Sequence, residues 1–199
     1  MRALAALTDD LFAPAMHQLV DDGQGGIRYW PAAIDPDTAR RWFDALRAGA
    51  AWTHLQRPMY DRIVDVPRLL ANYAVDRLPA DLPLAELLAC VQARAPAPYS
   101  RIGMNLYRDG NDSVAMHGDK LHTLAAGHPI TLVSLGAPRR MLIRARAGAR
   151  ETLSVDLAPG SVLSMSHASQ RTHEHGIPKT RRPQGARISV VFRVRPTTA

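Results

Sequence analysis

A histidine and an aspartate stand two residues apart at His117 and Asp119, within the stretch RIGMNLYRDGNDSVAMHGDK that covers residues 101–120. The stretch predicts a short strand, a turn rich in Asp, Gly and Asn, and a second short strand that ends at the histidine. Side chains two apart on an extended backbone point to the same side, so this imidazole and carboxylate can close on one metal ion. Together with one distant histidine they would form the facial ligand set of non-haem Fe(II) sites. A chain with 8 His and 18 acidic residues contains such a pair by chance, so the metal site depends on a third ligand.

The third ligand should come from far downstream, on another strand. His173 and His175 stand close together in the stretch RTHEHGIPK, and His167 precedes them. In an extended segment the first two share a face, yet a facial triad has room for only one of them. Composition leaves the three histidines as open alternatives.

The stretch RISVVFR, residues 187–193, offers groups that an organic acid would bind. On a strand, Arg187, Ser189 and Arg193 share one face, while the positions facing the other way are apolar and belong in the core. Arginine binds carboxylates through paired hydrogen bonds. The alternative is a pair of surface arginines on an edge strand.

Two helices are expected before the strands. Asp35 as the capping residue and Pro36 in the first turn favour a helix, and Ala39, Trp42, Phe43 and Leu46 follow helical spacing as its core face. A second helix, residues 83–93, should bury its leucines and Val91 against a sheet. The segment between them, residues 52–73, mixes aromatics, Arg and Pro and predicts a hairpin-like or irregular surface segment.

After Tyr99 the chain is strand-like, with Gly and Pro between short apolar runs. Regular short strands with turn residues between them indicate a sandwich or barrel. We therefore predict an α+β, mainly β fold, namely a double-stranded β-helix (jelly-roll) core with supporting N-terminal helices. The expected strands are residues 102–107, 130–135, 140–146, 152–157, 161–165 and 187–195.

Composition narrows the class of protein and its surroundings. With 199 residues and 46% hydrophobic residues, the chain can form one core. It has no run of 18 apolar residues, its start lacks a secretory signal, and its single Cys90 fits a reducing cytoplasm. The net charge of +7 favours an anionic partner, nucleic acid first, although a basic proteome with Arg-rich solvated faces gives the same balance.

Taken in order, four motifs resemble the AlkB family of Fe(II)- and 2-oxoglutarate-dependent dioxygenases, over residues 56–195. The resemblance implies direct reversal of alkylation damage. In that reaction the alkyl group on a nucleobase is oxidised while 2-oxoglutarate is decarboxylated, and the alkyl carbon leaves as an aldehyde. The motifs are Asn105-x-Tyr107-x-x-Gly110, His117-x-Asp119, His175-x-x-Pro178 and Arg187-x-Ser189-x-x-Phe192-Arg193.

The resemblance also implies roles for single residues. The distal histidine of the family precedes a short run ending in Pro, which selects His175 over His173; with His117 and Asp119 it would bind Fe(II), leaving sites for 2-oxoglutarate and dioxygen. The residues that would hold 2-oxoglutarate are Asn105, Tyr107, Arg187, Ser189 and Arg193, with Ser189 at a position where some members have Asn.

The resemblance is thinner where the substrate would bind. Many members carry an acid two residues after the ligand aspartate, where this chain has Leu121. Bulkier, more neutral lesions such as etheno bases then become expected substrates, with a reduced catalytic scope as the equal alternative. Val66-Pro67-Arg68 and Tyr73 resemble a nucleotide-recognition lid, and Tyr60 lies near the wedge position of that lid. Ordinary packing of these side chains is the alternative.

These expectations combine into one hypothesis. Residues 1–26 would form an N-terminal arm, residues 27–98 the helical support and lid, and residues 99–199 the catalytic core, with 27–199 as one structural domain. The protein would be a cytoplasmic, bacterial-type monomer that acts on alkylated single- or double-stranded DNA, without a membrane or protein partner. The alternatives are an RNA demethylase with the same site, a non-catalytic jelly roll that binds damaged nucleic acid, and a zinc hydrolase, which would not need the arginine pair.

Overall fold

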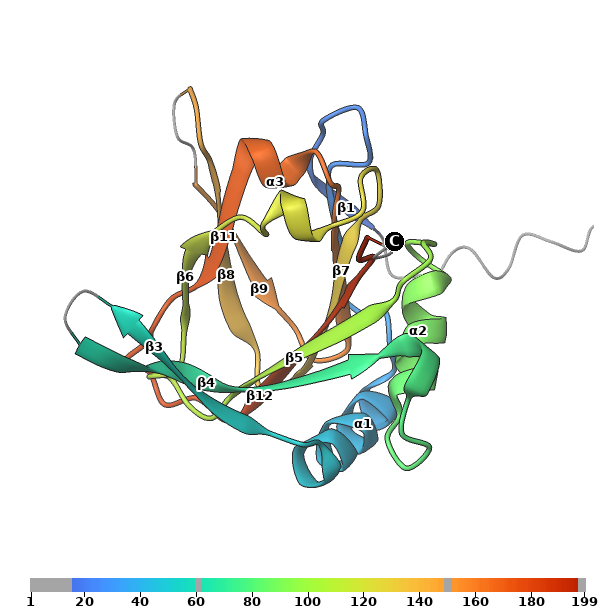
Figure 1. The fold of residues 1–199 in the computed structure, drawn as a ribbon, viewed down its shortest axis with the longest axis vertical. Helices are drawn as coiled ribbons and strands as arrows, with labels where there is room; N and C mark the ends of the chain where they lie inside the picture. The colour runs from blue at the N-terminus through green and yellow to red at the C-terminus, as the bar shows by residue number, and fades with distance from the viewer. Residues whose placement is uncertain (1–15, 60–61, 149–151, 197–199) are drawn as a thin grey trace, which may run out of the picture.

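The computed structural model describes residues 16–59, 62–148 and 152–196. Two antiparallel sheets face each other in this part of the chain (Figure 1). The eight-stranded sheet runs in the order β1 (His17–Val20), β2 (Ile27–Trp30), β10 (Ser161–Met165), β7 (Ile130–Gly136), β12 (Arg187–Arg193), β5 (Arg101–Tyr107), β4 (Arg62–Ala74) and β3 (Thr53–Met59). The four-stranded sheet runs in the order β6 (Val114–His117), β11 (His173–Ile177), β8 (Arg139–Ala145) and β9 (Thr152–Leu157). This is the expected jelly roll.

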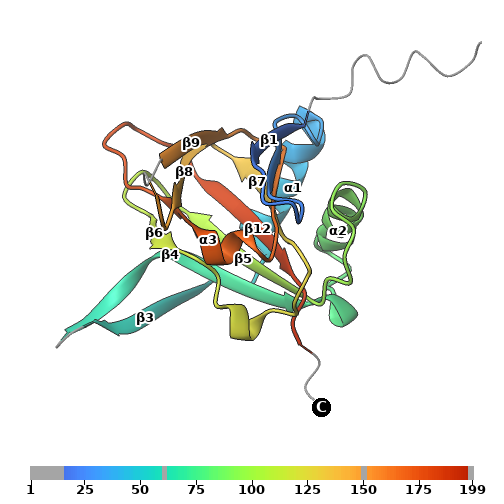
Figure 2. The same ribbon diagram turned by 90° about the horizontal axis from the view of Figure 1, so that it is seen from above.

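Two helices support the large sheet from outside, α1 (Pro36–Gly49) and α2 (Leu84–Gln92), as Figure 2 shows. Asp35 caps α1 as predicted, because its side chain accepts a hydrogen bond of 2.9 Å from the backbone N–H of Thr38. The remaining helical segments are short: η1 (Val75–Arg77), η2 (Leu121–Thr123) and α3 (Ser169–Thr172).

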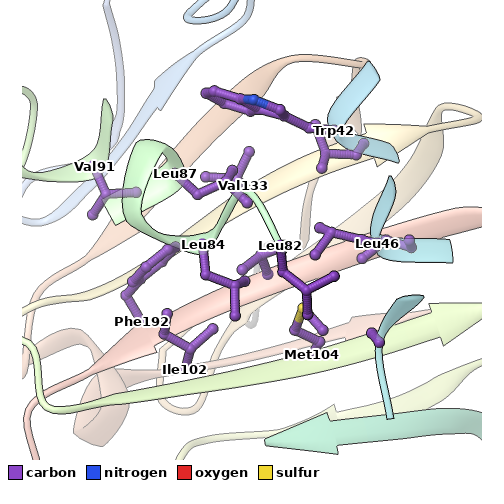
Figure 3. Packing of buried hydrophobic residues seen from close by; sticks show 14 of the residues in the cluster. Trp42, Leu46, Leu82, Leu84, Leu87, Val91, Ile102, Met104, Val133 and Phe192 are labelled. Atoms are coloured by element: carbon purple, nitrogen blue, oxygen red, sulfur yellow. The ribbon is translucent and has the colours of Figure 1, made fainter. Parts of the chain in front are cut away.

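The hydrophobic core has two parts, one on each face of the large sheet. The first lies between the helices and the sheet, where Leu46, Leu84 and Leu87 are fully buried against Val133 and Phe192 (Figure 3). The second lies between the two sheets and includes Ile130, Leu132, Ile143 and Leu163. The second part is incomplete, because polar side chains line a cavity between the sheets.

The segment 52–73 is hairpin-like, as one of the two expected alternatives, but it is not confined to the surface. It forms the hairpin β3–β4, and β4 is an inner strand of the large sheet, bonded to β5 through residues 69–74. The far half of the hairpin pairs only within itself and projects past the sheet (Figures 1 and 2). Local sequence could not show this, since it requires pairing with a strand about thirty residues downstream.

Part of the expected N-terminal arm pairs with the large sheet. Residues 1–15 of that arm lie outside the described residues. However, His17–Val20 form the edge strand β1 and pair with β2. Asp22 closes the turn between them by accepting hydrogen bonds from the N–H groups of Gln24 and Gly26. This part of the chain therefore belongs to the sheet.

Among the described residues, no helix is long and apolar enough to cross a membrane.

Candidate active site

Pairing between β6 and β11 brings two histidines face to face. His117 and His175 are cross-strand partners, and their ring centroids lie 4.6 Å apart. Asp119 follows β6 by two residues and turns into the same space. The ligand atoms of these three residues all lie within 4.8 Å of one another. Of the three downstream histidines, the structure brings only His175 into this group, as the motif order predicted.

Two of the three residues are held by hydrogen bonds of their own. The Nδ1–H of His117 donates to the carbonyl of Ala115 at 2.9 Å, which leaves its Nε2 lone pair for a metal. The backbone N–H of Asp119 donates to Oε1 of Gln170 at 2.9 Å. Gln170 is buried in α3, close before β11, and gave no signal in the sequence.

The pKa values of Asp119 and His175 suit a metal site. Burial favours the protonated form of Asp119, but Arg193 and the two imidazoles outweigh it and hold its pKa below the ordinary value. Burial, reinforced by His117, lowers the pKa of His175 to about 4 despite the opposing effect of Asp119. Two neutral imidazoles and one carboxylate are the donor set of an Fe(II) facial triad, so the residues fit this ion.

Arg193 pairs with the ligand carboxylate. Its Nε donates to Oδ2 of Asp119 at 2.7 Å, and its Nη2 to Oδ1 at 3.2 Å. This contact orients the carboxylate and neutralises part of its charge. Arg193 also lines the cavity, so anchoring of 2-oxoglutarate by this residue stays a prediction.

A cavity of about 790 Å³ opens beside the three ligands. Arg187 forms part of its wall and is only 1% exposed. Its Nε donates to Oγ of Ser134 at 2.9 Å, while Nη1 and Nη2 are buried without a hydrogen-bond partner among the described residues. Burial lowers the pKa of Arg187. A buried guanidinium with an unpaired outer edge fits a carboxylate ligand, which can accept from both nitrogens.

The other expected co-substrate residues surround Arg187. Cross-strand pairing sets Ser189 beside Asn105 and Arg187 beside Tyr107, and all four line the cavity. The guanidinium of Arg187 lies 5.2 Å from the centre of the Tyr107 ring. The residues therefore fit a small dianionic acid such as 2-oxoglutarate.

Sequence reasoning missed Arg139, which lies 5.5 Å from the centre of the Tyr107 ring. It is 3% exposed and donates to the carbonyls of Asp109, Asp112 and Pro178, each at 2.9 Å. Arg139 thus joins the loop after β5 to the end of β11. Its neighbour in sequence, Arg140, is exposed, and composition does not distinguish the two.

The structure does not place Tyr73 or Leu121, two of the residues expected to contact nucleic acid, on the cavity wall. The Tyr73 hydroxyl accepts from the N–H of Ala51, and its ring packs against the helix-side core, so this side chain has no place in the cavity. Tyr60 lies outside the described residues. At Leu121 the chain turns into η2, and Lys120 and Thr123 line the cavity instead.

The structure combines a jelly roll, a group of two histidines and one aspartate, and a buried arginine whose outer nitrogens can bind a carboxylate. This combination is typical of the class of non-haem iron oxygenases. The chain belongs to the 2OG-Fe(II) oxygenase superfamily, whose family model matches residues 26–193. Fe(II), 2-oxoglutarate and dioxygen are the cofactor and co-substrates that this superfamily shares.

Similar curated proteins confirm the resemblance to the AlkB family. The chain is 33% identical to DNA oxidative demethylase ALKBH2 of Bos taurus over 103 residues, which are 48% of this chain and 37% of that protein. It is 24% identical to alpha-ketoglutarate-dependent dioxygenase alkB homolog 3 of Mus musculus over 190 residues, 86% of this chain and 66% of that protein. The chain thus spans well under half of the length of ALKBH2.

Solved structures support the fold. The structure of OsALKBH1 superposes with a TM-score of 0.58 at 16% identity, covering 85% of this chain and 96% of that one. An oxidoreductase of the 2OG-Fe(II) oxygenase family from Burkholderia pseudomallei gives a TM-score of 0.55 at 18% identity, covering 84% and 85% of the two chains.

Removal of any one ligand should abolish tight metal binding. We expect His117→Ala, Asp119→Ala and His175→Ala to weaken Mn(II) binding by more than about 100-fold, because a facial triad has no spare protein ligand. His173→Ala is the control and should bind as the wild type does. Isothermal titration of the apoprotein measures this. If His173→Ala lost the metal and His175→Ala kept it, the distal ligand would be wrongly assigned.

The buried His175 should make the stability of the apoprotein depend on pH. Its folded pKa of about 4 lies below the ordinary 6.5, so the unfolded chain binds a proton that the folded chain refuses. The contribution of His175 to the free energy of unfolding is fully present above pH 6.5 and is lost as the pH falls toward 4. The total loss is up to about 3 kcal/mol. Urea unfolding at pH values from about 7.5 down to about 4.5, which span the titration range of histidine, measures this change in the free energy of unfolding. His175→Gln should flatten this part of the profile, and an unchanged profile would contradict the assignment.

Replacement of Arg187 should separate stability from function. Arg187→Met removes a buried charge whose two outer nitrogens have no hydrogen-bond partner among the described residues, so the thermal stability of the apoprotein should be unchanged or higher. Binding of 2-oxoglutarate should fall by roughly 30-fold or more, since a paired charge-assisted contact is worth about 2–5 kcal/mol. Thermal melts with and without 2-oxoglutarate and Mn(II) measure both. Undiminished stabilisation of Arg187→Met by 2-oxoglutarate would remove this residue from the co-substrate site.

Proposed function

We propose that this chain is an Fe(II)- and 2-oxoglutarate-dependent dioxygenase that oxidatively dealkylates damaged nucleobases in DNA. The observation that carries the proposal is that the buried, unpaired edge of Arg187 and the ligand group of His117, Asp119 and His175 share one cavity. A zinc hydrolase or a non-catalytic binding protein would leave that arginine unexplained. Relatives whose names describe DNA demethylation supply the substrate class.

The chain's own residues would bind and orient the reactants. His117, Asp119 and His175 would hold Fe(II) on one side and leave its remaining positions open to the cavity. Arg187 would pair with one carboxylate of 2-oxoglutarate, with Tyr107, Asn105 and Ser189 around it. When bound, iron and 2-oxoglutarate supply the oxidising power by activating dioxygen with release of carbon dioxide and succinate. No acid or base from the protein is required, and positioning carries the rate.

The wall of the cavity suits a nucleobase on a charged backbone. Val64, Val66 and Pro67 of β4 form an apolar side of it, and Lys120 and Arg195 supply positive charge. An extruded base could pack on the apolar side while its phosphates meet the cations. The net charge of +7 adds a general attraction for DNA.

We include etheno adducts among the proposed substrates. Two acids line the cavity in the described part of the chain: Asp119, which pairs with Arg193, and Asp65, which is exposed and accepts a hydrogen bond from Gln56. A cationic methylated base would therefore gain little electrostatic stabilisation from the cavity wall. A neutral etheno base, which needs no such stabilisation, would bind at little disadvantage. RNA carrying the same lesions remains the alternative substrate.

The test is product release from defined lesions. Oligonucleotides that carry 1-methyladenine or ethenoadenine, single- or double-stranded, are incubated with enzyme, Fe(II), 2-oxoglutarate and oxygen. We expect lesion-dependent succinate and the matching aldehyde, with repaired adenine detected by mass spectrometry. Undamaged DNA and the Asp119→Ala variant are controls. Succinate formed at the same rate with damaged and undamaged DNA, and no repaired base, would refute the substrate class.

A further inference from the structure

Arg68, expected from the sequence to contact nucleic acid, connects three segments of the protein. Its Nε donates to Oδ1 of Asn105 on β5 at 2.8 Å, and its Nη1 donates to the carbonyl of Ser113 at 3.1 Å. The N–H of Ser113 in turn donates to the carbonyl of Pro67 at 2.9 Å. The start of the sheet-bound part of β4 is thus bonded both to β5 and to the segment that leads into β6 and its metal ligand.

The contact with Asn105 fixes which end of the amide faces the cavity. A guanidinium only donates hydrogen bonds, so the Asn105 atom beside Arg68 must be the carbonyl oxygen. The NH₂ group of Asn105 then lies on the other side of the side chain, and Asn105 is part of the cavity wall next to Ser189.

This orientation matters because the expected ligand is an anion. A carboxylate only accepts hydrogen bonds, so it gains from an NH₂ group and is repelled by a carbonyl oxygen. A free amide can rotate about its terminal bond, which has a broad, roughly two-fold preference. Without a partner on its oxygen, Asn105 would present the wrong end to the carboxylate for part of the time.

We infer that Arg68 is a positioning residue for the co-substrate: it holds the Asn105 amide with its donors toward the cavity and thereby sets the affinity for 2-oxoglutarate. This inference rests on the proposed function, which makes 2-oxoglutarate the anion in the cavity. It assigns to a residue of the hairpin strand β4 an effect on the co-substrate, where the sequence suggested an effect on nucleic acid.

The first experiment compares the two ligands. Arg68→Met should weaken binding of 2-oxoglutarate to the Mn(II)-loaded protein by about tenfold, the effect of one hydrogen bond to a charged group. Affinity for undamaged single-stranded DNA without 2-oxoglutarate should change by less than about twofold. A larger change would be expected if Arg68 contacted a phosphate, because the loss of one phosphate contact weakens binding by more than this. Isothermal titration and fluorescence anisotropy provide the two constants. Weakened DNA binding with unchanged 2-oxoglutarate binding would overturn the inference.

The second experiment tests whether Arg68 acts through Asn105. In an Asn105→Ala background the amide is gone, so Arg68→Met should cause no further loss of 2-oxoglutarate affinity. An equal loss in both backgrounds would mean that Arg68 acts by its charge alone, and the inference would be wrong. The matched control is Arg77→Met, which removes the same charge from an exposed position just after β4 and should bind 2-oxoglutarate as the wild type does.

Two further comparisons keep the outcome unambiguous. Arg68→Lys retains the charge but not the planar guanidinium that bonds to both Asn105 and Ser113, so it should show the same loss of 2-oxoglutarate affinity. This variant replaces Arg68→Met if that protein does not fold. Wild-type protein that binds Mn(II) but not 2-oxoglutarate would refute the proposed function itself. Wild type and both Arg68 variants binding 2-oxoglutarate equally would refute only the inference about Arg68.

Discussion

A buried guanidinium whose two outer nitrogens have no hydrogen-bond partner among the described residues is the constraint on which this structure depends. Arg187 can lie between the sheets only because Ser134 and the Tyr107 ring hold its inner side and an anion can complete its outer edge. An unpaired buried charge is destabilising, so the apoprotein carries a cost that a bound dicarboxylate removes. The buried charge of Arg187 that destabilises the apoprotein is therefore also the group that would attract an anion into the cavity.

The two sheets divide the chemistry between them. The large sheet supplies the co-substrate wall from β5 and β12, and the small sheet brings the two histidines together through β6 and β11. Asp119 and Arg193 join the two halves, because one follows β6 and the other ends β12. Backbone pairing fixes the residues within each group, and the side-chain pair of Asp119 and Arg193 links one group to the other. Rigid elements position reacting groups better than loops do.

A second set of residues, outside the four motifs of the metal and co-substrate groups, keeps those groups in place. Gln170 holds the backbone of Asp119, Arg139 supports Tyr107, and Arg68 orients Asn105. Each connects a ligand-bearing strand to a different segment of the chain. Such supporting contacts commonly decide how well a site binds, although they never touch the ligand.

The sequence by itself predicted the three residues that the structure brings together, the strand that carries Arg187 and Arg193, both helices and the jelly-roll class. The spacing of two at the end of β6, the alternation on β12 and the helical periodicity from Asp35 are local patterns, and the family resemblance selected His175. Tertiary structure alone decided the rest. It put β4 inside the large sheet, turned Tyr73 into the helix-side core, took Leu121 off the cavity wall and made partners of Arg68 and Asn105. The physical reason is that a side chain's face and partner depend on which distant strand pairs beside it, and the local sequence does not encode that pairing.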